Sequence, residues 1–93
     1  MRSPSRSWLS LLAVAAALGA ACDGVEQAGA CERYVACIRA LDATLDRATD
    51  LDRFDVGGAC WGSEEGALLC ERACNRGLEW QARQAAAPGE CQP

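Results

Sequence analysis

The sequence contains no histidine and no lysine, and only five of its 93 residues are aromatic. Histidine is the commonest general base and the commonest metal ligand in proteins, so its absence removes both uses. A Ser-His-Asp apparatus is therefore excluded, and we interpret Ser63 as a helix cap. Acidic residues outnumber arginines by thirteen to nine, for a net charge of −4. This charge argues against nucleic acid as a partner, because phosphate binding needs clustered basic residues.

Long hydrophobic runs are also missing. The longest, residues 9–18, is broken by one serine and would span about 15 Å as a helix, roughly half of a hydrocarbon core. Arg2 and Arg6 precede it, and the small residues 19–21 follow it. A charged start, a short apolar stretch and a small-residue exit are typical of a secretory signal peptide. We therefore predict a cleaved signal peptide over residues 1–21 and one small domain after it.

The next residue, Cys22, suggests a lipid anchor. Gly19-Ala20-Ala21-Cys22 resembles a bacterial lipobox, at which lipoprotein signal peptidase cuts before the cysteine. The resemblance implies a diacylglycerol thioether on Cys22 and acylation of the new amino group, although Leu18 lies one place earlier than is usual in the family. Ordinary signal peptidase could instead cut after Ala20 or Ala21, which leaves simple secretion as the alternative. An even number of remaining cysteines favours lipidation, because an odd cysteine in an exported protein is a reactive liability.

The mature chain, residues 22–93, has seven arginines against thirteen acidic residues, a net charge of −6. A domain this small usually needs covalent cross-links to be stable, and an exported compartment permits disulfides. We therefore predict three bonds among the remaining cysteines, which are Cys31, Cys37, Cys60, Cys70, Cys74 and Cys91. We interpret residues 22–29 as a short tether and residues 30–93 as a cysteine-rich domain.

Two helices are expected in this domain. From Ala30 to Ala48 the apolar residues recur at steps of three and four, which predicts an amphipathic helix with Asp42 on its polar face. A second helix is predicted over Gly66–Ala86, with Ser63 as its cap and Pro88 ending it. Residues 50–60 are interpreted as a loop. Helices joined by a loop are naturally antiparallel, so the predicted fold class is all-α, a small disulfide-stapled antiparallel helical hairpin.

Six cysteines allow fifteen pairings, and the sequence does not choose among them. The antiparallel arrangement favours Cys31–Cys91, Cys37–Cys74 and Cys60–Cys70. The rival set is Cys31–Cys74, Cys37–Cys70 and Cys60–Cys91. The bridges require the helices to approach closely, which small residues would permit at Ala36, Ala40, Ala73 and Gly77.

The patterns that could carry chemistry have simpler interpretations. Four of the cysteines could form a thiolate zinc site or a redox pair, but oxidation after export competes and the usual two-residue spacing is absent. The acidic residues Asp50, Asp52 and Asp55 do not fit an EF-hand ladder and are interpreted as a solvated loop. The aromatic residues Phe54, Trp61 and Trp80 are expected to cover the end of the core. We therefore expect no catalytic residue, no metal, no cofactor and no enzymatic activity.

The cysteine spacing carries a resemblance. Cys31-x-x-Tyr34-x-x-Cys37-Ile38, Gly57-Gly58-x-Cys60-Trp61, Cys70-x-x-x-Cys74 and Cys91 are similar to a loose group of small cysteine-rich lipoproteins from high-GC soil proteobacteria. The resemblance implies localisation and architecture, and no reaction. We expect a non-enzymatic lipoprotein of the cell envelope, anchored in either membrane through lipid on Cys22, that serves as a structural or interaction module for an unknown protein partner. The alternative is a secreted disulfide-rich inhibitor or toxin-like effector.

Overall fold

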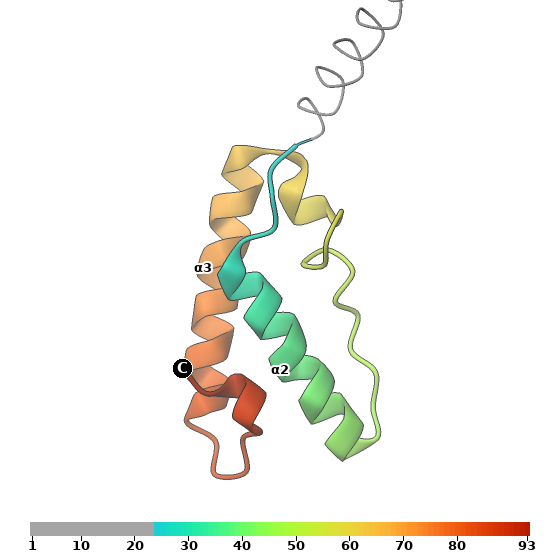
Figure 1. Cartoon of the computed structure of the whole chain (residues 1–93), viewed down its shortest axis with the longest axis vertical. Coiled ribbons are helices and arrows are strands. Elements are labelled where there is room, and N and C mark those ends of the chain that lie inside the picture. The colour runs from blue at the N-terminus through green and yellow to red at the C-terminus, as the bar shows by residue number, and fades with distance from the viewer. Residues whose placement is uncertain (1–23) are drawn as a thin grey trace, which may run out of the picture.

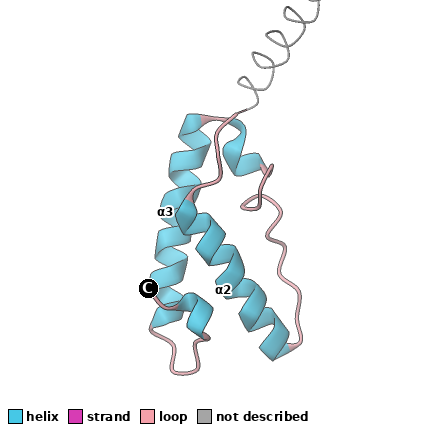
Figure 2. Cartoon of the chain, viewed as in Figure 1, coloured by secondary structure: helices cyan, strands magenta, loops and turns pink. Residues whose placement is uncertain are grey.

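The computed structural model describes residues 24–93, so the predicted signal peptide and Cys22 lie outside the described residues. The described part has two α-helices, α2 (Gly29–Leu45) and α3 (Glu64–Ala82), and two short 3-10 helices, η1 (Ala59–Gly62) and η2 (Gly89–Cys91). The rest of residues 24–93 is loop and turn, without a strand (Figure 2). The predicted all-helical, disulfide-stapled fold class is confirmed. None of these helices is long and apolar enough to cross a bilayer.

The direction of the second helix differs from the expectation. Figure 1 shows α2 and α3 running the same way, because residues 46–58, which we call the return loop, lead the chain back alongside α2. The contacts agree, since Cys31 is bonded to Cys74 and Tyr34 lies against Gly77, three residues further along each helix. The antiparallel part of the prediction is therefore corrected to a parallel pair.

The length of the connection explains this correction. Only short connections force neighbouring helices to be antiparallel. Here 18 residues separate Leu45 from Glu64. Helix α2 has 17 residues, about 25 Å at 1.5 Å per residue, and an extended chain covers more than twice that distance per residue. The connection is long enough to travel back along α2 before α3 begins.

Helix α2 begins one residue before the predicted start and ends three residues before the predicted end. It stops because Asp46 adopts the left-handed conformation, with φ 51°, and the Arg47 amide donates back to the carbonyl of Asp42. The side chain of Asp42 then accepts the amide hydrogen of Thr49 at 2.8 Å. These bonds turn the chain into the return loop.

Helix α3 follows its predicted cap directly, begins two residues before the predicted range and ends early. The hydroxyl of Ser63 accepts the amide of Gly66 at 3.1 Å, which confirms the predicted cap. The helix ends at Ala82, four residues before the predicted end. There the carbonyl of Trp80 accepts both the backbone amide of Arg83 at 3.3 Å and the side-chain amide of Gln84 at 2.9 Å. The chain then turns towards η2, which lies beside α2 (Figure 1).

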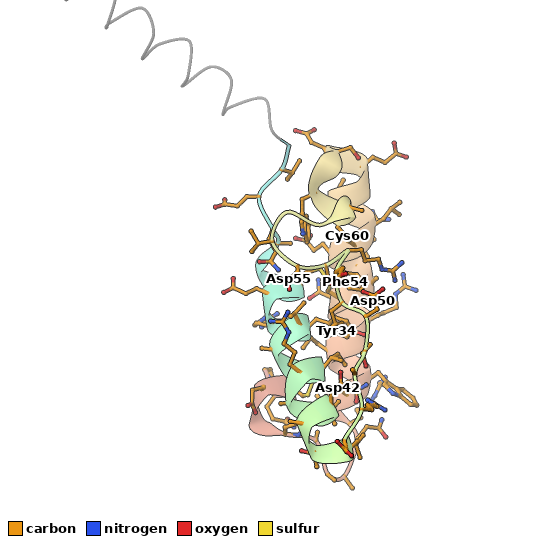
Figure 3. The ribbon with its side chains drawn as sticks, turned by 90° about the vertical axis from the view of Figure 1, so that its right-hand side faces the viewer. Tyr34, Asp42, Asp50, Phe54, Asp55 and Cys60 are labelled. Carbon is orange, nitrogen blue, oxygen red and sulfur yellow. A yellow bond between two sulfur atoms is a disulfide. The ribbon has the colours of Figure 1, made fainter. Side chains whose placement is uncertain are left out.

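The core is thin and lies between the two helices and the return loop. Its buried members are apolar or cysteine: Cys31, Val35, Cys37, Ile38, Leu51, Phe54, Cys60, Trp61, Cys74 and Cys91. Tyr34 of α2 meets Phe54 of the return loop edge to face, with ring centroids 5.5 Å apart (Figure 3). The loop therefore contributes to the core and is not merely a connection.

Residues 24–28, which lie within the predicted tether, are held against η1. The amide of Val25 donates to the carbonyl of Trp61 at 2.8 Å, and the side-chain amide of Gln27 donates to the carbonyl of Phe54 at 2.9 Å. Gly24 has a φ of +101°, and a Cβ there would lie 2.5 Å from the Trp61 carbonyl oxygen. Glycine is thus needed at this position, and the segment is part of the folded unit.

Candidate functional site

Three disulfides hold the described domain together. Cys31 is bonded to Cys74, Cys37 to Cys91 and Cys60 to Cys70, with Cα–Cα distances of 5.1, 4.6 and 5.9 Å. The first bond joins the two helices, the second ties η2 to the middle of α2, and the third fixes η1 to α3. Each of the three therefore links a different pair of elements.

This pairing mixes the two predicted sets and corrects both. Cys60–Cys70 belongs to the favoured set and Cys31–Cys74 to the rival set, whereas Cys37–Cys91 is in neither. The physical reason is the direction of α3. In a parallel pair Cys31, at the start of α2, lies beside Cys74 of α3. The segment that follows α3 then places Cys91 beside Cys37, in the middle of α2.

The close approach of the helices depends on one glycine. A Cβ on Gly77 would lie 2.4 Å from Cε1 of Tyr34, so the tyrosine ring occupies the space that any larger residue would need. Of the other small residues that we expected at the contact, Ala36 and Ala73 are exposed. That part of the expectation is wrong, because these two alanines face solvent in the parallel arrangement.

Asp42 is the polar residue that the sequence interpretation placed wrongly, on the solvent face of its helix. It is 9% exposed, and its carboxylate accepts hydrogen bonds from Arg47 Nε at 2.8 Å and from the hydroxyl of Thr49 at 2.9 Å (Figure 3). The bond from Arg47 and those from Thr49 hold the pKa of the Asp42 carboxyl below its ordinary value, against the opposing effect of desolvation. This carboxylate therefore fixes the turn between α2 and the return loop.

The other acidic residues of the return loop are not gathered into a site. Asp55 forms a salt bridge with Arg39 of α2, and Asp50 accepts the backbone amide of Asp52 at 3.1 Å. Among residues 24–93 no group of three carboxylate or cysteine side chains is arranged to hold a metal ion. The contacts of Asp50 and Asp55 are those of a structured, solvated loop.

The aromatic residues divide between the core and the surface. Phe54 and Trp61 are buried, and the indole nitrogen of Trp61 donates to the carbonyl of Asp55 at 2.9 Å. They cover the core as expected. Trp80 instead is 59% exposed, on α3.

Trp80 belongs to a surface that the sequence interpretation missed. Five exposed residues, Leu69, Arg72, Arg76, Trp80 and Arg83, follow one another at steps of three and four along α3 and its C-cap. We call them the α3 outer face. Trp80 was expected to cover the end of the core, and that expectation is wrong. Counting 100° per residue from the buried Cys74 would have placed Leu69 and Trp80 on the opposite side.

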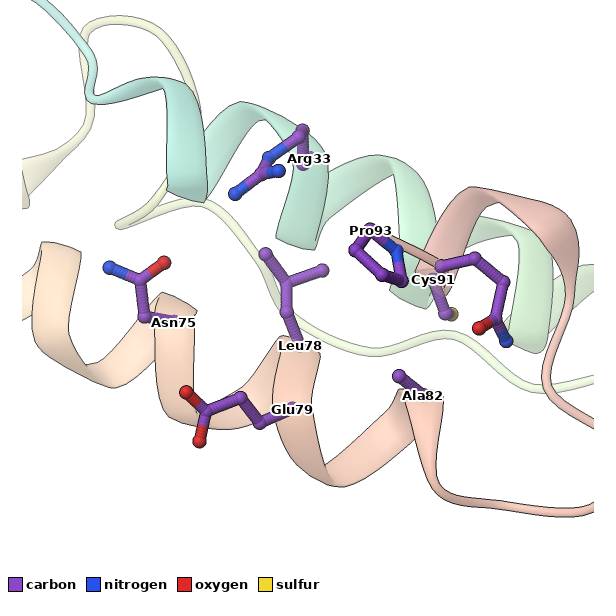
Figure 4. A pocket seen from close by; sticks show the side chains of 8 residues that line it. Arg33, Asn75, Leu78, Glu79, Ala82, Cys91 and Pro93 are labelled. Carbon is purple, nitrogen blue, oxygen red and sulfur yellow. The ribbon is translucent and has the colours of Figure 1, made fainter.

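Two shallow grooves flank α3. One, of about 180 Å³, lies between α2, α3 and the C-terminal residues, with Arg33 above Leu78 and Pro93 beside them (Figure 4). The other brings Val25 and Trp61 beside Leu68, and its lining also includes three glutamates, Glu26, Glu64 and Glu71. The side chains that line the two grooves are suited to binding contacts.

Comparison with protein-family models, with curated proteins and with solved structures found no match.

Proposed function

We propose that this chain is an exported, non-enzymatic protein of the cell envelope, held at the membrane by lipid on Cys22. Its disulfide-stapled domain serves as a structural or interaction module, and its acidic return loop is the surface offered to a protein partner. The signal-peptide pattern of residues 1–21 and the lipobox-like residues before Cys22 support export and anchoring.

One observation carries this proposal. The three disulfides use the six cysteines from Cys31 to Cys91, so the seventh cysteine of the chain, Cys22, has none left with which to pair. A thiol without a partner is a liability in an oxidising compartment, and thioether formation would remove it. Several acyl chains on one residue would give stable anchoring, because each buried CH₂ contributes about 0.8 kcal/mol.

Fractionation of cells that express the full chain tests the proposal. The wild-type protein should be found with membranes, and mass spectrometry of its N-terminal peptide should show acyl groups on Cys22. Cys22→Ala should move the protein to the soluble fraction or the medium. Ala20→Ser, which keeps both the cysteine and the small residue before it, should not. A free N-terminus in the medium for the wild type would contradict anchoring and favour the secreted inhibitor or effector.

A further inference from the structure

The α3 outer face points away from the core and has an unusual composition for this chain. At 100° per residue its five members fall within an arc of about 80°. Leu69 is 60% exposed and Trp80 is 59% exposed, and three arginines lie between and after them. Large apolar side chains and positive charges thus share one exposed side of a long helix.

The charge of this face contrasts with that of the whole domain. It holds three of the seven arginines in residues 22–93, a segment whose net charge is −6. The two salt bridges of the described residues involve other arginines, Arg39 and Arg47. One acidic residue, Glu65, shares the direction of the face, one turn before Leu69, and Glu79 borders it. Glu64 and Glu71 also belong to α3 but lie on other sides of the helix. Because screening limits exposed charges to a range of about 8 Å, a ligand along the stretch from Arg72 to Arg83 meets mainly the three arginines, opposed there by Glu79.

These residue types suit the boundary between lipid headgroups and acyl chains. Arginine side chains reach to phosphates while their stems lie on apolar material, and tryptophan is favoured where one end of the ring is wet and the other apolar. A helix that lies on a membrane combines basic residues with exposed Trp and Leu. The chemistry that complements the α3 outer face is therefore an anionic lipid surface.

The attachment of the N-terminal segment brings this face near a membrane. Gly24 is fixed against η1, and Val25 shares a groove with Leu68, next to the first residue of the face. Cys22 precedes Gly24 by two residues, at most about 7 Å of extended chain. Lipid on Cys22 would thus hold the domain against the bilayer with almost no slack, at the end of α3 where the face begins.

We propose that the α3 outer face lies along an anionic membrane surface. Arg72, Arg76 and Arg83 contact lipid phosphates, and Leu69 and Trp80 enter the interfacial region. The inference rests on the proposed function in one respect, since lipid on Cys22 supplies the proximity. The return loop and α3 lie on opposite sides of the molecule (Figure 1), so its aspartates then face away from the bilayer.

Vesicle binding by the oxidised mature chain carrying Cys22→Ser tests the inference without any lipid anchor. Its two tryptophans are Trp61, which is 3% exposed, and Trp80, so an emission change reports chiefly on Trp80. Phosphatidylglycerol vesicles should shift the emission to the blue and sediment the protein, and phosphatidylcholine vesicles should do neither. Added salt should weaken binding.

Two charge-matched variants locate the binding surface. Arg72→Gln with Arg76→Gln should weaken binding to phosphatidylglycerol vesicles by about thirtyfold, because each arginine near an anionic membrane is worth about 1 kcal/mol. Arg33→Gln with Arg53→Gln removes the same charge from exposed sites elsewhere and should change binding less than threefold. Circular dichroism should show that both variants remain folded.

Three results would overturn the inference: no binding to phosphatidylglycerol vesicles, equal losses in the two double variants, or binding to polyglutamate without binding to vesicles. The last result would assign the α3 outer face to an acidic protein. None of them bears on lipidation, which mass spectrometry of Cys22 tests separately. A Cys22 without lipid would likewise contradict the proposed function and leave the vesicle result standing.

Discussion

The three disulfides should contribute unequally to stability, and the sizes of the loops that they close set the order. Cys31–Cys74 spans 43 residues and Cys60–Cys70 spans 10. In the chain-entropy model these loops correspond to about 4 and about 2.7 kcal/mol, a difference of about 1.3 kcal/mol. Burial acts in the same direction, since Cys31 and Cys74 are 0% exposed while Cys70 is only partly buried, so truncation leaves a larger cavity at the first pair.

The comparison needs two double variants, Cys31→Ala with Cys74→Ala and Cys60→Ala with Cys70→Ala. Urea unfolding followed by far-ultraviolet circular dichroism gives the midpoint of each. With a slope of about 1 kcal/mol per molar urea for so small a domain, the first variant should unfold at a midpoint about 1 M below the second. A core this small rarely supplies more than about 3–5 kcal/mol, so the loss of about 4 kcal/mol should also place the midpoint of the first variant far below that of the wild type.

Reduction is the matched control for this experiment. In strong reductant the wild type and both variants lack every bond and should give the same unfolded spectrum. Equal midpoints, or a lower midpoint for the Cys60 and Cys70 variant, would refute the loop-size reasoning. A wild type whose midpoint is the same with and without reductant would refute the structural role of the disulfides altogether.

Two further predictions concern the turn at Asp42 and the contact at Gly77. Asp42→Asn should lower the urea midpoint at neutral pH. Because the folded pKa of Asp42 lies below its ordinary value, the stability that its carboxylate contributes is present above about pH 4 and lost as the pH falls through the folded pKa. The Asp42→Asn variant should therefore lose less stability than the wild type on acidification. An identical dependence of stability on pH in the two proteins would contradict this role of Asp42. Gly77→Ala should destabilise the domain, since overpacking against Tyr34 costs about 1–3 kcal/mol and exceeds the gain in helix propensity. Gly29→Ala, where a Cβ meets nothing within 4 Å, should keep or raise the thermal midpoint, and a drop as large as that of Gly77→Ala would argue against the Tyr34 contact.

The elements themselves could be predicted from the sequence because their signals are local. Apolar residues at steps of three and four mark both helices, and the hydroxyl of Ser63 with the acids that follow it marks the start of the second. The pair Cys60–Cys70 is similarly local, since it closes a loop of ten residues. These features need no knowledge of how distant parts of the chain meet.

The direction of α3 could not be read from such signals. It depends on where the return loop goes, and that path is set by contacts between distant residues, among them Arg39 with Asp55 and Tyr34 with Phe54. With the wrong direction, the favoured long-range pairs Cys31–Cys91 and Cys37–Cys74 are wrong as well. Asp42 was misplaced for a different reason: the helix ends earlier than the apolar pattern suggests, which lets Arg47 and Thr49, five and seven residues later, fold back over its side chain.

The order in which the disulfides connect the chain has a consequence for its maturation. Among the six bonded cysteines Cys31 and Cys37 are synthesised first, yet their partners, Cys74 and Cys91, lie 43 and 54 residues later. A chain that is oxidised while it emerges would join these early neighbours to each other, and thiol–disulfide exchange would then have to undo the error, on a timescale of seconds to hours. The yield of native protein should therefore depend on a disulfide isomerase, or on a thiol reductant that allows disulfide exchange, in the compartment where the protein matures. The supply of oxidant should matter much less.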